Sequence, residues 1–376
     1  MRRDKVIAII ANTSWNIYNF RLSLIEAIRD RGYKVIILAP RDRYSKKLER
    51  LGFEYIEIEM DNKGSNPFKD IAFTYRLYKI LKEIDVDMIL GYTIKINIYG
   101  SFVAKVLNIP MIATISGLGS AFLRDSFSSK VAIWLYRLAL RVPKRVFFQN
   151  RDDMRLFIDK GLVREDIASV VGGSGVDSVK FAPRDSQKRE DDTVRFLMVA
   201  RLLRDKGVVE YVEASKILSK ERDLIKMEFA LMGGFYTLNP SAISEEEVRA
   251  WESEGIISYL GERFDVASVM AKYDVIVLPS YREGLSRVLL EASSMAKVIV
   301  TTDVVGCRDV VRDGVNGFLV KVKDAYDLAQ KMKKVALLSR KRREEMGKMG
   351  RKIVLENFTQ EIVIDRYLSS IEELLK

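Results

Sequence analysis

The chain has 376 residues, of which 48% are hydrophobic and 31% charged, enough for a large core in two domains and too apolar for wholesale disorder. It has no histidine, which excludes a zinc site and a Ser-His-Asp triad. Its one cysteine, Cys307, cannot form an internal disulfide, which suits a reducing compartment. The net charge is +11, and residues 1–185 carry +10 of it, so the first half is expected to face an anionic membrane, a nucleic acid or a phosphorylated substrate, unless the charge serves solubility alone.

Short apolar runs alternate with helix-spaced segments throughout the first half of the chain. The charged start before the first run resembles a signal peptide, but the run is too short for one and is better interpreted as a buried strand. The alternation predicts a parallel sheet with helices on both faces. Strands are expected at 6–11, 34–38, 55–59, 88–90, 111–114, 146–148 and 168–171.

A glycine-rich and charged stretch at residues 172–192 lacks apolar periodicity and predicts a linker. The strand pattern then restarts, so the chain is expected to form a domain over 1–185 and a second α/β domain over 186–357. An amphipathic tail at 358–376 predicts a final helix, for which a coiled-coil contact is an alternative. Strands of the second half are expected at 195–199, 226–231, 256–259, 275–279, 298–301 and 318–320.

Two cations follow the first strand of the second domain. Arg201 comes at the strand end, and Lys206 and Gly207 open a helix. An arginine fork, a lysine charge and free helix amides at a strand end form a plausible diphosphate site. An ordinary charged surface loop is the alternative.

Two carboxylates, Glu283 and Glu291, lie eight positions apart across the end of another strand. Gly284 follows the first, and the apolar stripe of a helix is expected to start at Leu285. Eight residues at helical rise span roughly 12 Å, beyond the roughly 5–9.5 Å of paired glycosidase acids. The pair is therefore expected to hold opposite ends of an extended ligand, with a diphosphate between them on the amides of Gly284, Leu285 and Ser286. If they do not, Glu283 is a turn residue and Glu291 a surface helix residue.

Four segments in this order carry a family resemblance: "GSGVDSVKFAP", "VARLLRDKG", "EGLSRVLLE" and "DGVNGFLV". With them the sequence resembles the family-four retaining glycosyltransferases of the GT-B fold over essentially its whole length. The resemblance implies an α/β protein with two Rossmann-like, doubly wound domains facing a central cleft. It also implies that the tail helix packs back toward the first domain.

The resemblance implies transfer from a UDP-sugar co-substrate with retention, and it implies neither a cofactor nor a metal. In that picture the catalytic residues are Glu283, Arg201 and Lys206. Arg201 and Lys206 neutralise the leaving diphosphate, Glu291 holds the ribose, and Glu283 positions the donor sugar. The acceptor hydroxyl attacks from the face of the leaving phosphate, which takes its proton.

Segments of the first half, "NTSWNIYNFRL", "NPF", "GYTIKINIYGS" and "ISGLGSAF", resemble bacterial enzymes that extend undecaprenyl-diphosphate-linked sugars in surface polysaccharide or N-glycan assembly. This implies a polyprenyl-linked saccharide acceptor and a hexose or N-acetylhexosamine donor, with N-acetylgalactosamine as the best candidate. Many family members place a histidine near the donor sugar, and Thr93 or Lys95 is expected there instead. Asn16 is assigned to the donor side, and the acceptor or first-domain side is assigned to Ser14, Lys95, Gly117 and Gly119.

A lipid acceptor also fits residues 128–146, which mix apolar side chains around Trp134 with five cations. A basic amphipathic helix can lie on an anionic membrane, where each cation contributes about 1 kcal/mol. The alternative is a core-packed helix of the first domain. Membrane contact implies a peripheral enzyme on the cytoplasmic face of the inner membrane, and no nucleic-acid partner is expected.

Two further functions remain open from the sequence. A nucleotide-sugar 2-epimerase of the same fold would release a free epimerised sugar nucleotide and needs no membrane face. A two-domain sugar-binding protein would bind a nucleotide sugar without turnover.

Overall fold

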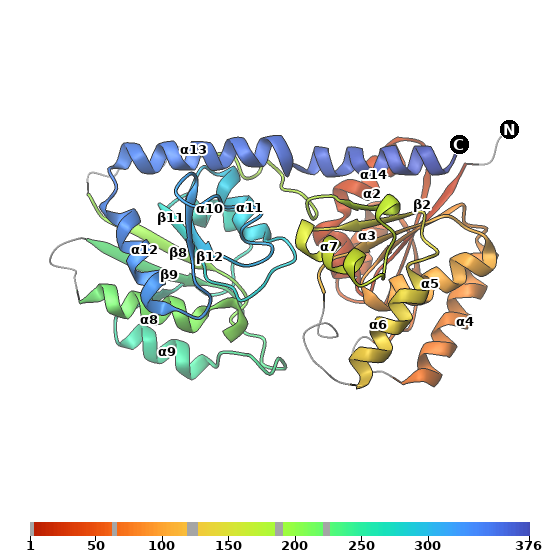
Figure 1. Cartoon of the computed structure of the whole chain (residues 1–376), viewed down its shortest axis with the longest axis horizontal. Coiled ribbons are helices and arrows are strands. Elements are labelled where there is room, and N and C mark those ends of the chain that lie inside the picture. The colour runs from red at the N-terminus through yellow and green to blue at the C-terminus, as the bar shows by residue number, and fades with distance from the viewer. Residues whose placement is uncertain (1–3, 62–65, 119–126, 185–190, 221–225) are drawn as a thin grey trace. The chain divides into compact units, whose positions relative to one another are not determined.

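The computed structural model describes residues 4–61, 66–118, 127–184, 191–220 and 226–376. The chain forms two compact units (Figure 1). Unit 1 comprises residues 1–174 and Gln360–Lys376, and unit 2 comprises Gly175–Thr359. The sequence-based boundary at 185 differs from this division, because residues 175–184 pack within unit 2. Val176 pairs with Thr359, and Phe181 is buried in the core of that unit.

Unit 1 is built on a seven-stranded parallel sheet in the order β3-β2-β1-β4-β5-β6-β7. Its central strands are buried along their whole length, which explains why they are continuous apolar runs rather than alternating ones. All seven strands expected in this half are present. They are β1 (Val6–Ile10), β2 (Lys34–Ala39), β3 (Glu54–Glu57), β4 (Met88–Tyr92), β5 (Met111–Ile115), β6 (Arg145–Phe148) and β7 (Ala168–Val170).

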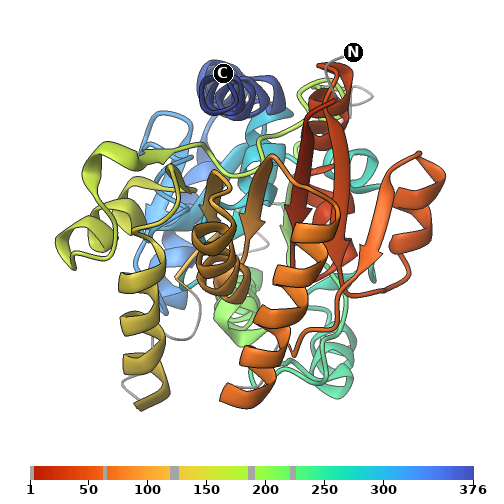
Figure 2. The same cartoon turned by 90° about the vertical axis from the view of Figure 1, so that its right-hand side faces the viewer.

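Helices cover both faces of this sheet and form two separate apolar cores. One face carries α1 (Ser14–Phe20), α2 (Leu22–Asp30), α3 (Ser45–Arg50) and α14 (Gln360–Leu374). The other carries α4 (Pro67–Glu83), α5 (Ile94–Leu107), α6 (Phe127–Ala139) and α7 (Arg151–Asp159). Figure 2 shows α4, α5 and α6 as neighbouring helices on one side of the sheet.

The last helix, α14, completes the core of unit 1. Tyr367 is fully buried, its ring packs edge-on against Phe147 at 4.8 Å, and its hydroxyl lies 2.7 Å from that of Thr114. Arg145 pairs with Glu373 at 2.7 Å at the surface. The amphipathic tail thus supplies an integral layer of the first unit.

Unit 2 repeats the architecture with a six-stranded parallel sheet in the order β10-β9-β8-β11-β12-β13. All six expected strands are present: β8 (Val194–Val199), β9 (Met227–Met232), β10 (Ser258–Tyr259), β11 (Val275–Leu278), β12 (Val298–Thr302) and β13 (Gly317–Val320). Its helices are α8 (Val208–Ser219), α9 (Glu245–Ser253), α10 (Val266–Met270), α11 (Arg287–Ser294), α12 (Ala325–Leu337) and α13 (Arg340–Asn357). The two sheets are Rossmann-like, as the sequence predicts.

The strand order reverses between β1 and β4 in unit 1, and between β8 and β11 in unit 2. At such a switch point the connections leave in opposite directions, and the carboxyl ends of the two strands open a crevice. Functional residues are therefore expected after these four strands.

Candidate functional site

Two loops of unit 2 are joined at its switch point, one after β8 and one after β11. The Tyr281 amide donates to the Asp205 carbonyl at 2.9 Å, and the Ser280 hydroxyl donates to the same oxygen at 3.3 Å. The Tyr281 hydroxyl donates to Glu210 of α8 at 2.7 Å. These bonds fix the cation-bearing loop against the carboxylate-bearing loop, although the two are more than 70 residues apart in sequence.

Lys206 and Glu283 meet where these loops join. The Lys206 Nζ lies 2.7 Å from the Glu283 Oε1, and the side chains are only 17% and 15% exposed. An ammonium has three protons to donate, so Lys206 can bind an anion while it holds Glu283. The structure thus brings together two residues that the sequence places in one site.

A close backbone approach permits this meeting. Gly207 has φ +76°, and a Cβ there would lie 2.1 Å from the carbonyl oxygen of Pro279. Only glycine allows both this backbone conformation and this contact. The amino end of α8, which Gly207 caps, therefore lies directly against the end of β11.

A third loop, after β12, forms backbone hydrogen bonds with the loop that carries Glu283. The Glu283 amide donates to the Val305 carbonyl at 3.1 Å, and the Ser286 amide donates to the Gly306 carbonyl at 3.2 Å. Gly306 has φ +78°, and a Cβ there would lie 2.5 Å from the Glu283 carbonyl oxygen. Cys307 beside it is fully buried, and burial, reinforced by the charge of Glu283, raises the pKa of its thiol to about 12. Cys307 is therefore an inert packing residue.

Ser286 begins the helix that carries Glu291. Helix α11 starts at Arg287 rather than at Leu285, because the Ser286 side chain accepts the Leu289 amide at 3.5 Å and acts as its N-cap. Leu285 is buried, and Gly284 lies in the loop between Glu283 and the cap. The predicted run of amides thus leads into the amino end of α11.

Glu291 is buried rather than a surface helix residue, with 7% of its area exposed. Burial raises the pKa of its carboxyl above the ordinary value of 4.5, and the charges of Arg287 and Lys180 oppose this shift. The Arg287 guanidinium lies 3.2 Å from its Oε1. A buried acceptor with a raised pKa is a typical candidate for a functional group.

Arg201 lies apart from the Lys206–Glu283 pair. Its side chain is exposed, and its guanidinium lies over the ring of Tyr236, 5.4 Å from the centroid. Within the part of the chain that the structure describes, Arg201 has no ion pair with Glu283 or Glu291.

In unit 1, polar groups without partners gather at the β1/β4 switch point. Asn16 is on α1, just after β1, and its buried Oδ1 has no hydrogen-bond partner among the described residues. Thr93 directly follows β4 with φ +74°, and its buried hydroxyl also lacks a described partner. Strained backbone and unpaired polar atoms in a crevice indicate a ligand site. Ser14 is buried beside them, with its hydroxyl bonded to Asp42.

The other residues assigned to unit 1 have different surroundings. Lys95 lies 2.7 Å from Asp70, which also accepts the Tyr99 hydroxyl at 2.9 Å. Burial, followed by the Asp70 contact, raises the pKa of Tyr99. Gly117 follows β5 with φ +136°, and Gly119 lies outside the described residues.

Sequence reasoning missed the residues that hold the site together. Gly306, Asp205 and Tyr281 act through backbone contacts between loops that are distant in sequence, so no local spacing identifies them. A faint signal was available in "VVGCRD", where a glycine lies in the loop after β12 and precedes a buried cysteine.

Comparisons with known proteins match both units. The family described as "Glycosyl transferases group 1" matches residues 179–353, and "Glycosyl transferase 4-like" matches residues 6–150. The N,N'-diacetylbacillosaminyl-diphospho-undecaprenol alpha-1,3-N-acetylgalactosaminyltransferase of Campylobacter jejuni is 31% identical, over 98% of this chain and 99% of the relative. The UDP-Gal:alpha-D-GlcNAc-diphosphoundecaprenol alpha-1,3-galactosyltransferase of Escherichia coli is 25% identical, over 68% of each chain.

Solved structures share the fold. A crystal structure of a glycosyltransferase from Rickettsia africae superposes with a TM-score of 0.82 at 20% identity, covering 100% of this chain and 99% of that one.

Proposed function

Because the chain belongs to the group 1 glycosyltransferases and is an enzyme of that kind, we propose that it transfers a hexose or N-acetylhexosamine from a UDP-sugar to an undecaprenyl-diphosphate-linked saccharide in surface polysaccharide or glycan assembly. The supporting observation is the buried Lys206–Glu283 pair at the switch point of unit 2, one loop away from buried Glu291. N-acetylgalactosamine is the proposed sugar, since the relative that matches nearly the whole chain is named for it.

The proposed donor site uses the geometry of unit 2. Lys206 and the amino ends of α8 and α11 bind the diphosphate, and Arg201 closes onto it from Tyr236. Glu291 accepts the ribose hydroxyls, and Glu283, held by Lys206 and by the loop after β12, accepts hydroxyls of the donor sugar. No metal or cofactor takes part in the proposed reaction.

The proposed reaction breaks the bond between the sugar C1 and the β-phosphate oxygen of UDP. The acceptor hydroxyl oxygen forms the new bond to C1 on the same face, and its proton passes to the leaving phosphate. Both relatives are named as alpha-1,3 transferases, and an α-linked product from an α-linked sugar nucleotide means retention. Stabilisation of the negatively charged leaving diphosphate by Lys206, Arg201 and the helix amides is the proposed main source of rate enhancement.

Unit 1 is the proposed acceptor side, and Asn16 and Thr93 are its proposed contacts to the donor. Asn16 and Thr93 offer buried, unpartnered oxygen atoms at its switch point, where this chain has no histidine to contribute. Ser14, Lys95 and Gly117 lie on connections at the same edge of the sheet.

Within the described ranges, no helix combines the length and the apolar character needed to cross a bilayer. Peripheral attachment to the cytoplasmic face of the inner membrane, through the basic surface of unit 1, is therefore part of the proposal.

The deciding experiment is a screen of UDP- and GDP-sugars against polyprenyl-diphosphate-linked saccharides, with product analysis for the anomeric configuration. We expect transfer from UDP-N-acetylgalactosamine with an α-linked product. Lys206→Ala should abolish it while the circular dichroism spectrum stays native. Release of a free epimerised sugar nucleotide, or binding of donor without turnover, would contradict the proposal.

A further inference from the structure

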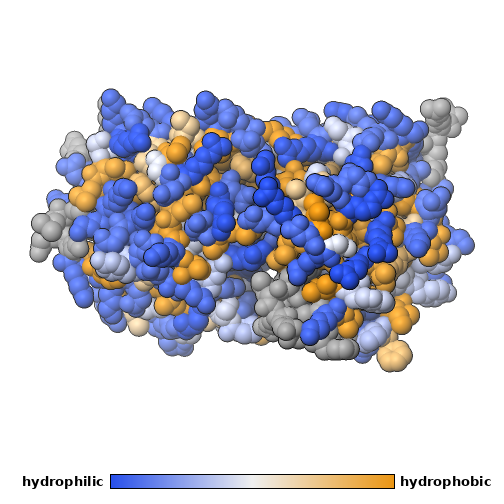
Figure 3. Space-filling model, in the orientation of Figure 1, coloured by the Kyte–Doolittle hydropathy of each residue, from blue (hydrophilic) through white to orange (hydrophobic). Residues whose placement is uncertain are grey.

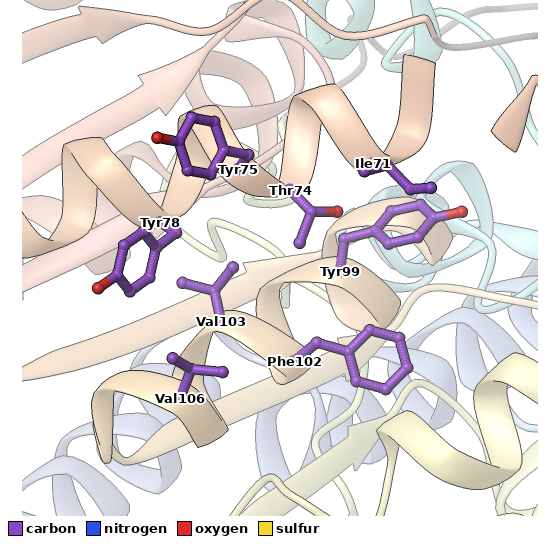
Figure 4. A pocket seen from close by; sticks show the side chains of 8 residues that line it. All are labelled: Ile71, Thr74, Tyr75, Tyr78, Tyr99, Phe102, Val103 and Val106. Carbon is purple, nitrogen blue, oxygen red and sulfur yellow. The ribbon is translucent and has the colours of Figure 1, made fainter. Parts of the chain in front are cut away.

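Two adjoining hollows open on the face of unit 1 that carries α4, α5 and α6. The first is a groove of about 520 Å³ between α4 and α5, and Figure 4 shows its lining side chains. Tyr75 and Tyr78 of α4 stand opposite Val103 and Val106 of α5, and the lining is almost wholly apolar.

The second hollow is a pocket of about 560 Å³ between the carboxyl end of α5 and the end of α6. Lys105, Arg141 and Lys144 line it, and none of the three has an ion-pair partner among the residues that the structure places. Phe102 lines both hollows, so the cationic pocket adjoins the apolar groove. No residue lining either hollow carries a carboxylate.

Exposed apolar side chains surround the hollows. Ile71 is 67% exposed and Val106 72%, and both line the same groove, so they belong to one apolar patch rather than to scattered surface side chains. On α6, Trp134 is 57% exposed and lies one turn before Leu138, which lines the cationic pocket. Figure 3 shows apolar surface on this side of unit 1 among hydrophilic side chains. Helix α6 thus packs its Tyr136 side into the core and leaves its Trp134 side uncovered.

We propose that this face is a binding site for an anionic phospholipid of the bilayer, with hydrocarbon along the α4/α5 groove and the headgroup phosphate on Lys105, Arg141 and Lys144. An amphipathic ligand matches an apolar groove that adjoins a cationic pocket. A second copy of the same face would bring like charges together, which disfavours self-association as the use of this surface.

The site is distinct from the proposed substrate site at the switch point of unit 1. The cationic pocket lies where β5 and β6 begin, whereas Asn16 and Thr93 follow the ends of β1 and β4. In a parallel sheet these are opposite edges, so the headgroup site does not hold the reacting saccharide. The inference deepens the proposed function by assigning the membrane contact to particular residues, and it rests on that function only for its biological purpose.

The test measures binding to vesicles of equimolar phosphatidylglycerol and phosphatidylcholine by co-sedimentation. A cation near an anionic membrane raises partitioning roughly fivefold, so Lys105→Glu/Arg141→Glu should lower it by about 25-fold or more. The matched control is Lys46→Glu/Arg50→Glu on α3, which makes the same charge change on the opposite face of the sheet. Ile71→Ser/Val106→Ser should also weaken binding, with exposed Leu337→Ser in unit 2 as its control. Brominated acyl chains should quench fluorescence in the wild type and not in Trp134→Phe.

An equal loss of vesicle binding in the α3 control would overturn the proposal. So would vesicle binding at the wild-type level in both the Lys105→Glu/Arg141→Glu and the Ile71→Ser/Val106→Ser variants, which are called the groove variants below. So would a dimer that the Ile71→Ser/Val106→Ser change dissociates while vesicle binding stays intact. Transfer to a water-soluble acceptor with a short prenyl chain separates this inference from the proposed function. The groove variants should keep that activity, whereas a wild type that binds vesicles and transfers nothing would contradict the transferase assignment alone.

Discussion

Glu291 combines burial with a proposed role, the binding of the ribose hydroxyls, that requires charge. Burial raises the pKa of its carboxyl above 4.5, so the carboxylate becomes protonated at a higher pH than an exposed glutamate. The protonated form is a poorer acceptor for two ribose hydroxyls, so the KM for the UDP-sugar should rise as the pH falls through the raised pKa. Over the same window the folded protein binds the proton more tightly than the unfolded chain, so the free energy of unfolding gains from this group as the pH falls.

The measurement is KM against pH for the wild type and for Glu291→Gln. The amide variant should have a raised KM that no longer depends on pH in this window. An unchanged pH profile in the variant would show that another group is titrating.

Gly306 supports Glu283 through a contact that no side chain can replace. A Cβ at Gly306 would lie 2.5 Å from the Glu283 carbonyl oxygen, so Gly306→Ala should displace the loop and lower kcat/KM at least tenfold. Gly314 is a matched control, because it has φ +72° but nothing within 4 Å of its Cβ position. Both variants should lose roughly 1–3 kcal/mol of stability through backbone strain, whereas only Gly306→Ala should lose activity. Equal activity loss in Gly314→Ala would remove the role assigned to the contact.

At the scale of elements, Ser286 tests whether helix capping and ligand binding coincide. Ser286→Ala removes the N-cap of α11 and should lower the free energy of unfolding by about 0.5–2 kcal/mol, whereas Ser286→Asn should retain it. Ser339 caps α13 in the same way, accepting the Arg342 amide at 3.2 Å. Chemical denaturation of Ser286→Ala, Ser286→Asn and Ser339→Ala measures their stabilities. The KM for the donor shows whether Ser286 also affects ligand binding. If Ser286→Ala raises KM and Ser339→Ala does not, the α11 terminus binds the donor; equal KM values would limit Ser286 to capping.

The central strands were predictable because each is a short, continuous apolar run, and burial on both sheet faces leaves no other pattern. The start of α11 was misplaced by two residues, because the apolar stripe begins at Leu285 while the cap is Ser286. Helix α6 packs one face into the core, as the core-packed alternative expects, and exposes the other, while its contact with a membrane stays a prediction. The groove on α4 and α5 was not predicted, because an exposed apolar residue on a helix looks like a core residue in sequence.

The sequence placed Lys206 and Glu283 in one site, since both follow strand ends and parallel strands collect their carboxyl ends at one edge. The ion pair between the two side chains was not predicted. The supporting role of Gly306 and the strained Thr93 depend on contacts between distant loops, which spacing along the chain does not encode.

At the scale of the whole molecule, the chain crosses between its units twice, at Ser174/Gly175 and at Thr359/Gln360, and each unit has its own apolar core. Separate cores of this size are expected to unfold in separate transitions. Because the proposed UDP site lies in unit 2, UDP at about 100 times its Kd should add about 2.7 kcal/mol to that unit alone, which raises its Tm by roughly 5–10 °C. Tyr367→Ala removes a buried ring from unit 1 and should lower the free energy of unfolding of that unit by about 3–5 kcal/mol. The Tm of the transition that belongs to unit 1 should fall accordingly.

Differential scanning calorimetry of the wild type and of Tyr367→Ala, each with and without UDP, measures these shifts in Tm. If UDP raises the Tm of one transition and Tyr367→Ala lowers the Tm of the other, the nucleotide binds unit 2 and α14 belongs to the core of unit 1. If UDP raised the transition that Tyr367→Ala lowers, while the second transition stayed fixed, the nucleotide would belong to unit 1. Lys206 and Glu291 would then have no donor to hold.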